Sequence, residues 1–194
     1  MVWFCVGRVK PMLRILLFIA ASAAILPLSW RPLKDVRTHG FYRFFAFEFL
    51  IALILLNLPV WWRDPFCWRQ LASYLLGVVS IGLVIEGFRL LKVIGRPGPS
   101  NIESANLAIE NTTTLVTVGA YRWIRHPLYA SLLALAWCAW LKDPLRAGSV
   151  ALMMGTSGFL LATAVAEERE NLRRFGAAYA EYKKRTWRFI PFVF

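Results

Sequence analysis

Five apolar runs constrain what this 194-residue chain can fold into more than any other feature. They cover residues 15–30, 41–62, 71 to about 94, 128–141 and 145–166. A helix needs roughly 20 apolar residues to cross a hydrocarbon core of about 30 Å, so each run is a candidate transmembrane helix, although the first and fourth are short. With 58% hydrophobic and 15% aromatic residues, the chain is too apolar for a soluble domain. We therefore expect an integral, multi-pass membrane protein.

The runs are separated by polar segments that lack strand-like alternation, and no internal repeat is evident. This pattern predicts an all-α fold with about five transmembrane helices and a C-terminal cytoplasmic helix, in a single membrane domain over residues 1–194. Three N-terminal spans would occupy residues 1–94. The half from 95 to 194 would hold a long polar connection, a helical hairpin and the C-terminal helix. A Rossmann domain is not expected.

Lys142, Asp143 and Pro144 form a tight turn signal between the fourth and fifth runs. The two runs should therefore form a hairpin whose ends return to one membrane face. That arrangement would bring His126, before the fourth run, close to Glu167, after the fifth.

The net charge of +12 reports orientation in a chain of this kind, rather than nucleic-acid binding. If the C-terminus is cytoplasmic, 16 of the 23 Lys and Arg residues fall on the cytoplasmic side. We therefore expect an outside N-terminus and an inside C-terminus. The charges at Arg8, Lys10 and Arg14 resemble the start of a signal peptide, but no small-residue cleavage site follows, so the first run is expected to be retained.

Cysteine and histidine are too sparse to suggest a metal centre or a disulfide framework. The three cysteines contain no Cys-x-x-Cys pair, and His39 and His126 are the only histidines. We expect a metal-free chemistry.

Two polar clusters flank the hairpin. One is the stretch from Gly119 to Tyr129, and the other is Glu167-Glu168. Polar groups at the edge of a bilayer are costly unless they are paired or used, which suggests one shared site. Pro127 suits the first turn of a helix, where free N–H groups favour an anion. Interfacial positions next to a span would explain the same residues without a site.

The residues after Glu167 predict a charged helix with one continuous face formed by Glu168, Leu172, Phe175 and Tyr179. This pattern favours Glu168 as the inward-facing acid. Another acid, Glu86, lies inside the third run, where Arg89 at i+3 offers a salt bridge.

Two ordered motifs carry a more specific signal, and they cover roughly residues 106–192. They read Leu115-Val116-Thr117-x-Gly119-x-Tyr121-Arg122-x-x-Arg125-His126-Pro127-x-Tyr129 and Glu167-Glu168-x-x-x-Leu172-x-x-Phe175-Gly176-x-x-Tyr179-x-x-Tyr182, followed by Ile190-Pro191-Phe192. Together they resemble the isoprenylcysteine carboxyl methyltransferase family, in its short prokaryotic form.

The resemblance implies an S-adenosylmethionine-dependent methyltransferase, which releases S-adenosylhomocysteine and takes a lipophilic acceptor from the bilayer. Carried over by position, the cofactor-binding residues would be Asn106, Thr113, Thr114, Leu115, Val116, Tyr121, His126, Pro127, Leu128, Tyr129 and Glu167. Glu167 would also be catalytic, which conflicts with the helical pattern that favours Glu168. We follow the motif.

The natural acceptor is less well defined than the cofactor. Family members acting on prenylcysteine carry an Arg four residues before the first Glu, and this chain has Thr163 there. Arg173 or Arg174 is then a candidate partner for an acceptor carboxylate, and Arg173 is the one assigned to the site. A prenylcysteine-like carboxylate is the leading acceptor. The alternatives are a phospholipid amine, a sterol-reductase-like enzyme that uses NADPH, and a membrane scaffold without activity.

Overall fold

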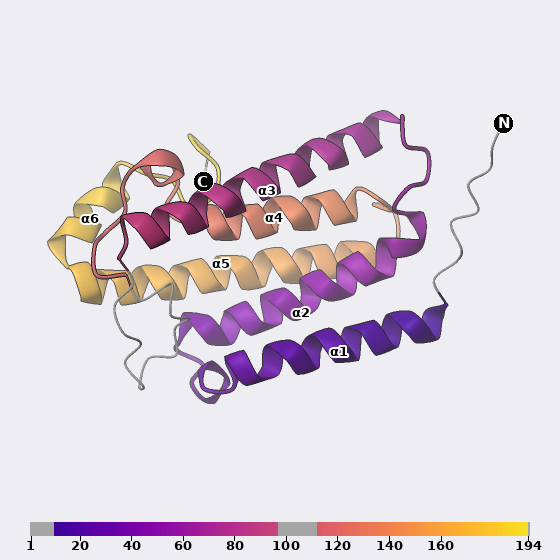
Figure 1. Ribbon diagram of the computed structural model, residues 1–194, viewed down its shortest axis with the longest axis horizontal. Coiled ribbons are helices and arrows are strands. Elements are labelled where there is room, and N and C mark those ends of the chain that lie inside the picture. The colour runs from indigo at the N-terminus through magenta and orange to yellow at the C-terminus, as the bar shows by residue number, and fades with distance from the viewer. Residues whose placement is uncertain (1–9, 97–111, 194) are drawn as a thin grey trace.

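The computed structural model describes residues 10–96 and 112–193, and these residues form a helical bundle (Figure 1). The described α-helices are α1 (Pro11–Ser29), α2 (His39–Asn57), α3 (Trp68–Val93), α4 (Pro127–Trp140), α5 (Ala147–Phe175) and α6 (Ala177–Lys184). Short 3-10 turns connect them at η1 (Pro32–Lys34), η2 (Leu58–Val60) and η4 (Gly119–Arg122). The all-helical prediction is confirmed.

The helices do not lie in chain order. The α4–α5 hairpin sits between α2 and α3, so that α5 packs mainly on α2 and α4 mainly on α3, while α1 lies on the outer side of α2 (Figure 1). The predicted hairpin is confirmed. Its two helices are therefore shielded on both sides by the N-terminal helices.

Four helices are long and apolar enough to cross a membrane, and the fifth is shorter. The four are Pro11–Ser29, His39–Val60, Trp68–Val93 and Ala147–Phe175, whereas α4 has 14 residues. At 1.5 Å per residue α4 is about 21 Å long, less than the hydrocarbon thickness. Because α4 is packed between α3 and α5, other helices cover it along its length.

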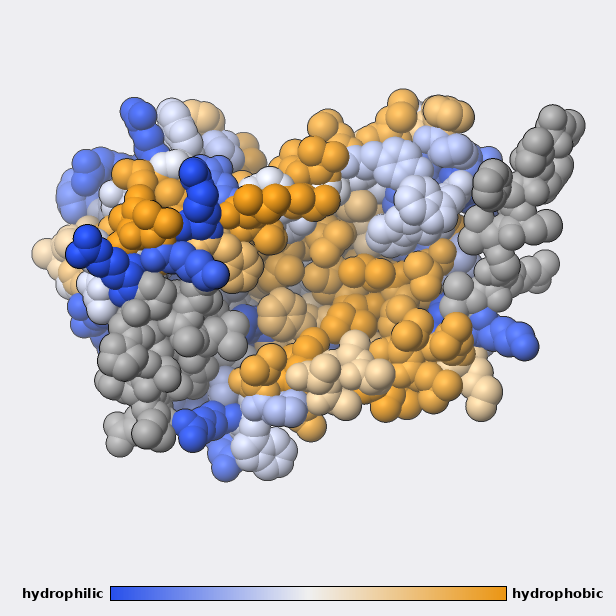
Figure 2. All heavy atoms as spheres, in the orientation of Figure 1, coloured by the Kyte–Doolittle hydropathy of each residue, from blue (hydrophilic) through white to orange (hydrophobic). Residues whose placement is uncertain are grey.

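The outward faces of α1 and α3 carry the exposed apolar side chains expected of a surface in lipid. Ile15 on α1 is 60% exposed, and Leu75 and Val78 on α3 are 65% and 66% exposed. Figure 2 shows hydrophobic residues over most of the middle of one face, and hydrophilic residues gathered towards the end that holds α6. The protein is a multi-pass membrane protein.

Small residues bring the inner helices close together. Ala46 of α2, Ala136 and Ala139 of α4, and Ala164 of α5 are almost completely buried. Gly155 of α5 faces the ring of Phe49 so closely that a Cβ would overlap it. The bundle is held by close backbone packing as well as by apolar contact.

The prediction of one continuous helical face beyond Glu168 is wrong. The helix breaks at Gly176, whose φ of +55° is accessible to glycine but strained for other residues. Helix α5 ends at Phe175, and α6 turns away from its axis. Along the predicted face, Leu172 is 36% exposed, whereas Glu168 and Tyr179 are buried.

Candidate functional site

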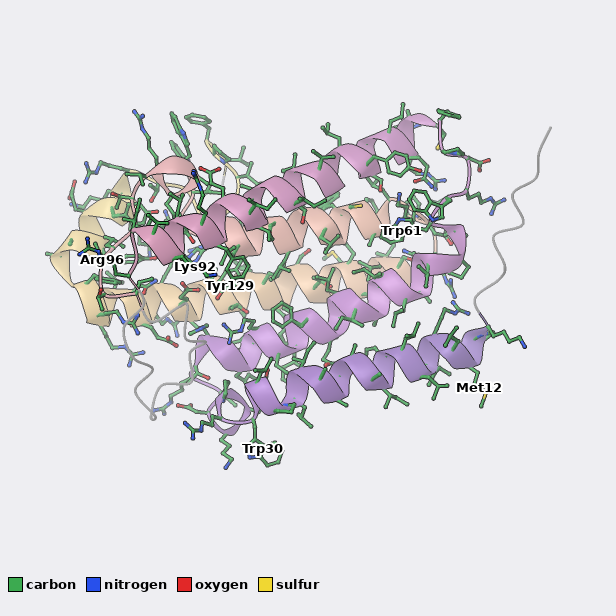
Figure 3. The ribbon with its side chains drawn as sticks, viewed as in Figure 1. Met12, Trp30, Trp61, Lys92, Arg96 and Tyr129 are labelled. Atoms are coloured by element: carbon green, nitrogen blue, oxygen red, sulfur yellow. The ribbon has the colours of Figure 1, made fainter. Side chains whose placement is uncertain are left out.

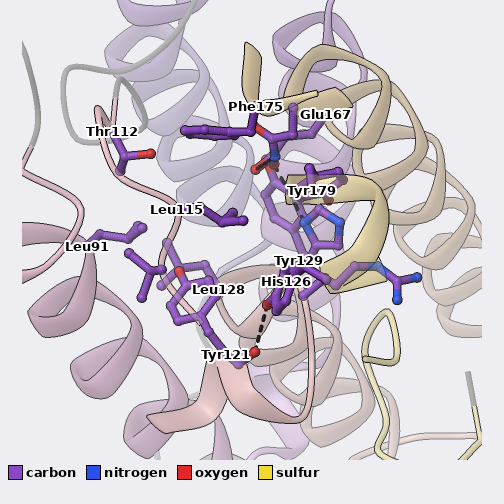
Figure 4. Close-up of a pocket in the computed structure, with 14 residues that line it drawn as sticks. Leu91, Thr112, Leu115, Tyr121, His126, Leu128, Tyr129, Glu167, Phe175 and Tyr179 are labelled. Carbon is purple, nitrogen blue, oxygen red and sulfur yellow. Dashed lines mark hydrogen bonds and ion pairs between the residues drawn. The ribbon is translucent and has the colours of Figure 1, made fainter. Parts of the chain in front are cut away.

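A pocket lies where the first turn of α4, the end of α5 and α6 meet (Figure 4). Its floor is formed by His126, Leu128 and Tyr129 at the start of α4, and Glu167 faces it from α5. The predicted proximity of His126 and Glu167 is observed, since His126 Nδ1 lies 3.8 Å from Glu167 Oε2. The hairpin thus brings the two motifs together.

Seven of the residues expected to bind a cofactor line this pocket, namely Leu115, Val116, Tyr121, His126, Leu128, Tyr129 and Glu167. The other four expected residues are not among the described residues that line the pocket. The amide groups of Thr113 and Thr114 both donate to the carbonyl of Gly95, and Pro127 is buried at the first turn of α4 outside the lining. Asn106 lies outside the described residues. A cofactor role for each of these positions stays a prediction.

Arg173, expected near an acceptor carboxylate, does not line the pocket. Its side chain is exposed, and its Nε donates to the carbonyl of Arg169 at 3.4 Å. The difference arises because α5 continues as a regular helix through this position, which puts Arg173 on a different face from Glu167.

Sequence reasoning missed seven lining residues: Leu91, Thr112, Arg125, Asn171, Phe175, Tyr179 and Tyr182. Asn171 follows Glu167 by one helical turn, so i+4 spacing was an available signal. Four others belong to the motifs but were not assigned to the site. Leu91 and Thr112 gave no signal, because they reach the pocket only through the packing of α3 and the following loop.

Glu168 is a buried ionic centre beside the pocket. Its side chain is 3% exposed and pairs with Arg125 at 3.0 Å, Lys183 at 2.9 Å and Arg188 at 3.1 Å. Arg125 also donates to the carbonyls of Lys183 and Thr186. Glu168 therefore ties α5 to the start of α4 and to the C-terminal segment.

Adjacent glutamates thus have different surroundings. Glu168 is nearly sequestered, whereas Glu167 is 26% exposed and faces the pocket, with Asn171 Nδ2 3.5 Å from its Oε1. Successive residues of a regular helix point about 100° apart, which explains the division. The sequence pattern placed Glu168 inside correctly, and the motif placed Glu167 at the pocket.

The ring of His126 lies between the two carboxylates. Its Nε2 is 3.5 Å from Glu168 Oε1 and has no hydrogen-bond partner within the described part of the chain. The ring stacks on Tyr129 with a centroid distance of 5.5 Å. This geometry fixes the ring plane and turns Nδ1 towards Glu167.

Two tyrosines from α6 close the far wall. The hydroxyl of Tyr182 donates to the carbonyl of Tyr121 at 2.6 Å. Burial raises the pKa of both Tyr179 and Tyr182 above the ordinary value, and the negative charges of Glu168 and Glu167 raise that of Tyr179 further. Both hydroxyls therefore stay protonated at neutral pH.

Glu86 holds the loop that enters the pocket. Its Oε1 accepts a hydrogen bond from the amide of Ala120 at 2.9 Å, which is a different partner from the Arg89 predicted by spacing. Gly119 has φ +58°, and a Cβ there would lie 2.5 Å from Glu86 Oε1. Only glycine allows this loop to approach α3 so closely.

Within the described residues, no group of three or more His, Cys, Asp and Glu side chains is arranged to hold a metal ion. The pocket instead combines a carboxylate, an amide, an imidazole and several aromatic rings. Its free volume is about 80 Å³, below the roughly 300–1,000 Å³ of typical ligand pockets. A nucleoside-sized ligand would therefore require lining side chains to move.

Comparison with known proteins connects this arrangement to methyltransferases. Human protein-S-isoprenylcysteine O-methyltransferase is 33% identical over 172 residues, which cover 82% of this chain and 57% of the relative. Methanethiol S-methyltransferase 2 of Bradyrhizobium diazoefficiens is 28% identical over 77% of this chain and 60% of the relative. Methanethiol S-methyltransferase of Mycobacterium tuberculosis is 30% identical over 71 residues.

The chain thus spans less than two thirds of the length of these relatives. No family model matches it, and no solved structure matches it significantly. The likeness to the human and Bradyrhizobium proteins extends over most of this chain. The chain is therefore distantly similar, over most of its own length, to a protein-S-isoprenylcysteine O-methyltransferase and to a methanethiol S-methyltransferase.

Proposed function

We propose that the protein is a membrane methyltransferase that binds S-adenosylmethionine in the pocket between α4, α5 and α6. The observation that carries the proposal is the meeting of Glu167 with His126 at the start of α4, within 3.8 Å, in a pocket lined by aromatic side chains. The relatives are methyltransferases by name, which favours this cofactor over NADPH.

The lining residues suit a charged nucleoside. The Glu167 carboxylate can accept hydrogen bonds from ribose hydroxyls or attract a sulfonium cation. Amide groups at the start of α4 favour an amino-acid carboxylate, because the first turn of a helix has free N–H groups. Phe175 and Tyr179 offer aromatic faces for a base. The bound cofactor would supply a methyl group activated for transfer.

Thr163 bears on the acceptor. Its side chain is fully buried and its hydroxyl donates to the carbonyl of Phe159, so it offers no cation to an acceptor carboxylate. A prenylcysteine-like carboxylate remains the leading acceptor, because an ionised carboxylate is already a nucleophile and needs only desolvation and alignment.

A thiol is the second candidate, and the exposed position of Arg173 favours it. No cationic partner for a carboxylate is required in that reaction. The thiol would lose its proton, its sulfur would bond to the methyl carbon, and the bond from that carbon to the sulfonium sulfur of the cofactor would break. His126 with Glu167 would provide a place for the proton. The relatives named for methanethiol show that this chemistry occurs within the same homologous group.

We also propose that the pocket faces the cytoplasm. The ends of α3 and α5 and the start of α4 lie at one end of the bundle, where Figure 3 labels Lys92 and Arg96. Basic residues cluster there, as they do on cytoplasmic sides of membrane proteins. Labelling of a single cysteine at exposed Lys184 from either side of sealed vesicles tests this placement.

Binding of radiolabelled S-adenosylmethionine and of NADPH to the detergent-purified protein tests the proposal directly. We expect S-adenosylmethionine to bind and NADPH not to compete. His126→Ala should lower the affinity about ten- to a hundred-fold, the cost of losing a hydrogen bond near a charged ligand. Arg63→Gln is the matched control, since Arg63 is exposed and lies outside the pocket lining. Binding of NADPH without binding of S-adenosylmethionine would favour the reductase alternative.

The acceptor is tested separately with wild-type protein. Methyl transfer to a farnesylated cysteine carboxylate and to a short alkyl thiol should be measured side by side at saturating cofactor. Turnover of the carboxylate supports the leading proposal, and turnover of the thiol alone supports the second. Methylation of phosphatidylethanolamine instead would support the phospholipid alternative.

A further inference from the structure

A second cavity lies at the opposite end of the bundle from the pocket, between the start of α1, the end of α2 and the start of α5. Its volume is about 390 Å³. The wall is apolar and includes Ile15 and Phe18 of α1, Leu55 and Leu56 of α2, and Leu152 of α5. Because α1 faces lipid along its exposed side, this groove is accessible from the bilayer.

Two arginines stand in this otherwise apolar lining. Arg14 lies in the first turn of α1, and Arg146 is the residue before α5. Both lie near the bundle end, where membrane helices meet lipid headgroups. None of the described residues that line the groove is acidic. The groove therefore has a long apolar wall and a positively charged mouth.

The less exposed arginine of the mouth has a hydrogen-bond donor without a partner among the described residues. This donor is the Nε of Arg14, which is buried. Arg146 is exposed, and among the described residues its Nη1 donates to the carbonyl of Leu56 at 3.4 Å. Buried donors of charged groups are costly when unpaired, and a guanidinium pairs best with carboxylate or phosphate oxygens.

We propose that this groove binds one anionic phospholipid, with an acyl chain along the apolar wall and the phosphate between Arg14 and Arg146. Charge complementarity favours an anionic over a zwitterionic headgroup, because the lining offers two cations and no acid to a headgroup ammonium. The site is separate from the methyl-transfer pocket and does not depend on the proposed activity.

Native mass spectrometry of the full-length protein in detergent tests the proposal, with phosphatidylglycerol and phosphatidylcholine of identical acyl chains. We expect one phosphatidylglycerol per chain to be retained, with at least tenfold preference over phosphatidylcholine. Arg14→Gln and Arg146→Gln should each weaken retention about tenfold, the usual effect of removing a charge-assisted hydrogen bond. The double variant should lose the preference.

Arg63→Gln is the control for a generic loss of positive charge, because Arg63 is exposed at the same end and lies outside the groove. It should retain the lipid as wild type does. Ala52→Leu places bulk in the groove while keeping both arginines, and should reduce lipid retention with unchanged melting temperature.

Several outcomes would overturn the proposal. Equal retention of both lipids would show only annular contact. Unchanged retention in the double arginine variant would place the lipid elsewhere. Dimers that disappear in Arg14→Gln would assign the groove to a second copy of the chain, and lipid binding that appears only after residues 1–9 are removed would assign it to that segment.

Discussion

The two ends of the bundle both bury charged side chains, but they arrange them in opposite ways. At the pocket end, one carboxylate, Glu168, is surrounded by Arg125, Lys183 and Arg188 within 3.1 Å. At the other end one cation, Lys142, is buried against neutral contact groups, and burial, with the like charge of Arg69 close by, lowers its pKa. Its Nζ donates to Gln70 Oε1 at 2.7 Å and lies 4.2 Å from the centre of the Tyr74 ring.

The contrast shows that a buried charge can either anchor several segments around a pocket or be satisfied by a few neutral partners at one end of the bundle. Lys142 is 2% exposed, and its hydrogen-bond acceptor, Gln70 in the first turn of α3, in turn donates to the carbonyl of Arg63. Burial lowers the pKa of Lys142, because the charged form loses its water. At the pocket end the ionic centre anchors three segments around a cavity, and the neighbouring acid, Glu167, remains available to a ligand.

The largest expected effect is that of Glu168→Gln. Removing this charge leaves three cations around a nearly sequestered site, which should lower the free energy of unfolding by about 3–5 kcal/mol. Thermal melting in detergent measures the loss. Glu181→Gln is the matched control, because Glu181 forms an exposed i,i+3 pair with Lys184 and should cost less than about 1 kcal/mol. Equal melting of the two variants would show that the ionic centre is not structural.

Glu167→Gln should separate binding from stability. We expect cofactor affinity to fall about ten- to a hundred-fold, because the amide keeps the shape but removes the charge, while the melting temperature stays close to wild type. Titration with radiolabelled S-adenosylmethionine measures the change. If Glu168→Gln lost binding while fully stable and Glu167→Gln did not, the functional acid would be Glu168.

Lys142→Met should lower the stability of the protein without changing the pocket at the opposite end of the bundle. The side-chain oxygen Oε1 of Gln70 would lose its hydrogen-bond donor, at a cost of about 1–3 kcal/mol in stability, with cofactor affinity unchanged. Adding Gln70→Leu should not recover the loss, because it also removes the hydrogen bond from Gln70 Nε2 to the carbonyl of Arg63. Melting temperature and cofactor titration are read on the same samples. Weakened cofactor binding would contradict the independence of the two ends.

Alkaline titration should distinguish the ends by the sign of their response. The raised pKa values of Tyr179 and Tyr182 mean that the unfolded chain releases their protons first, so the stability they contribute is present below about pH 10 and is lost above it. At pH 11 the loss of unfolding free energy from each tyrosine should be about 1 kcal/mol.

The lowered pKa of Lys142 acts the other way. In the window below its ordinary value of 10.5, the unfolded chain holds this proton more tightly than the folded protein, so stability from this residue rises with pH. Denaturation at pH 7 to 11 should therefore show a shallower decline above pH 10 in Tyr182→Phe, and no rise from this source in Lys142→Met. Parallel curves for all three proteins would refute both assignments.

The sequence by itself determined much of the fold and part of the site. Five apolar runs predicted the five bundle helices, although only four of these helices are long enough to cross a membrane and α4 is shorter. The turn at Lys142, Asp143 and Pro144 predicted the hairpin, and thereby the meeting of His126 with Glu167. These features depend on local spacing and composition, which a single chain displays directly.

Tertiary structure decided the rest. Gly176 ended α5, where helical periodicity alone continued it, because a positive φ leaves no trace in a hydrophobic pattern. The insertion of the α4–α5 hairpin between α2 and α3 brought Leu91 and Thr112 to the pocket from segments distant in the sequence. The helical pattern placed Glu168 inward, but the folded C-terminal segment supplied two of its cationic partners, Lys183 and Arg188. Such long-range partners are set by packing, so no local pattern encodes them.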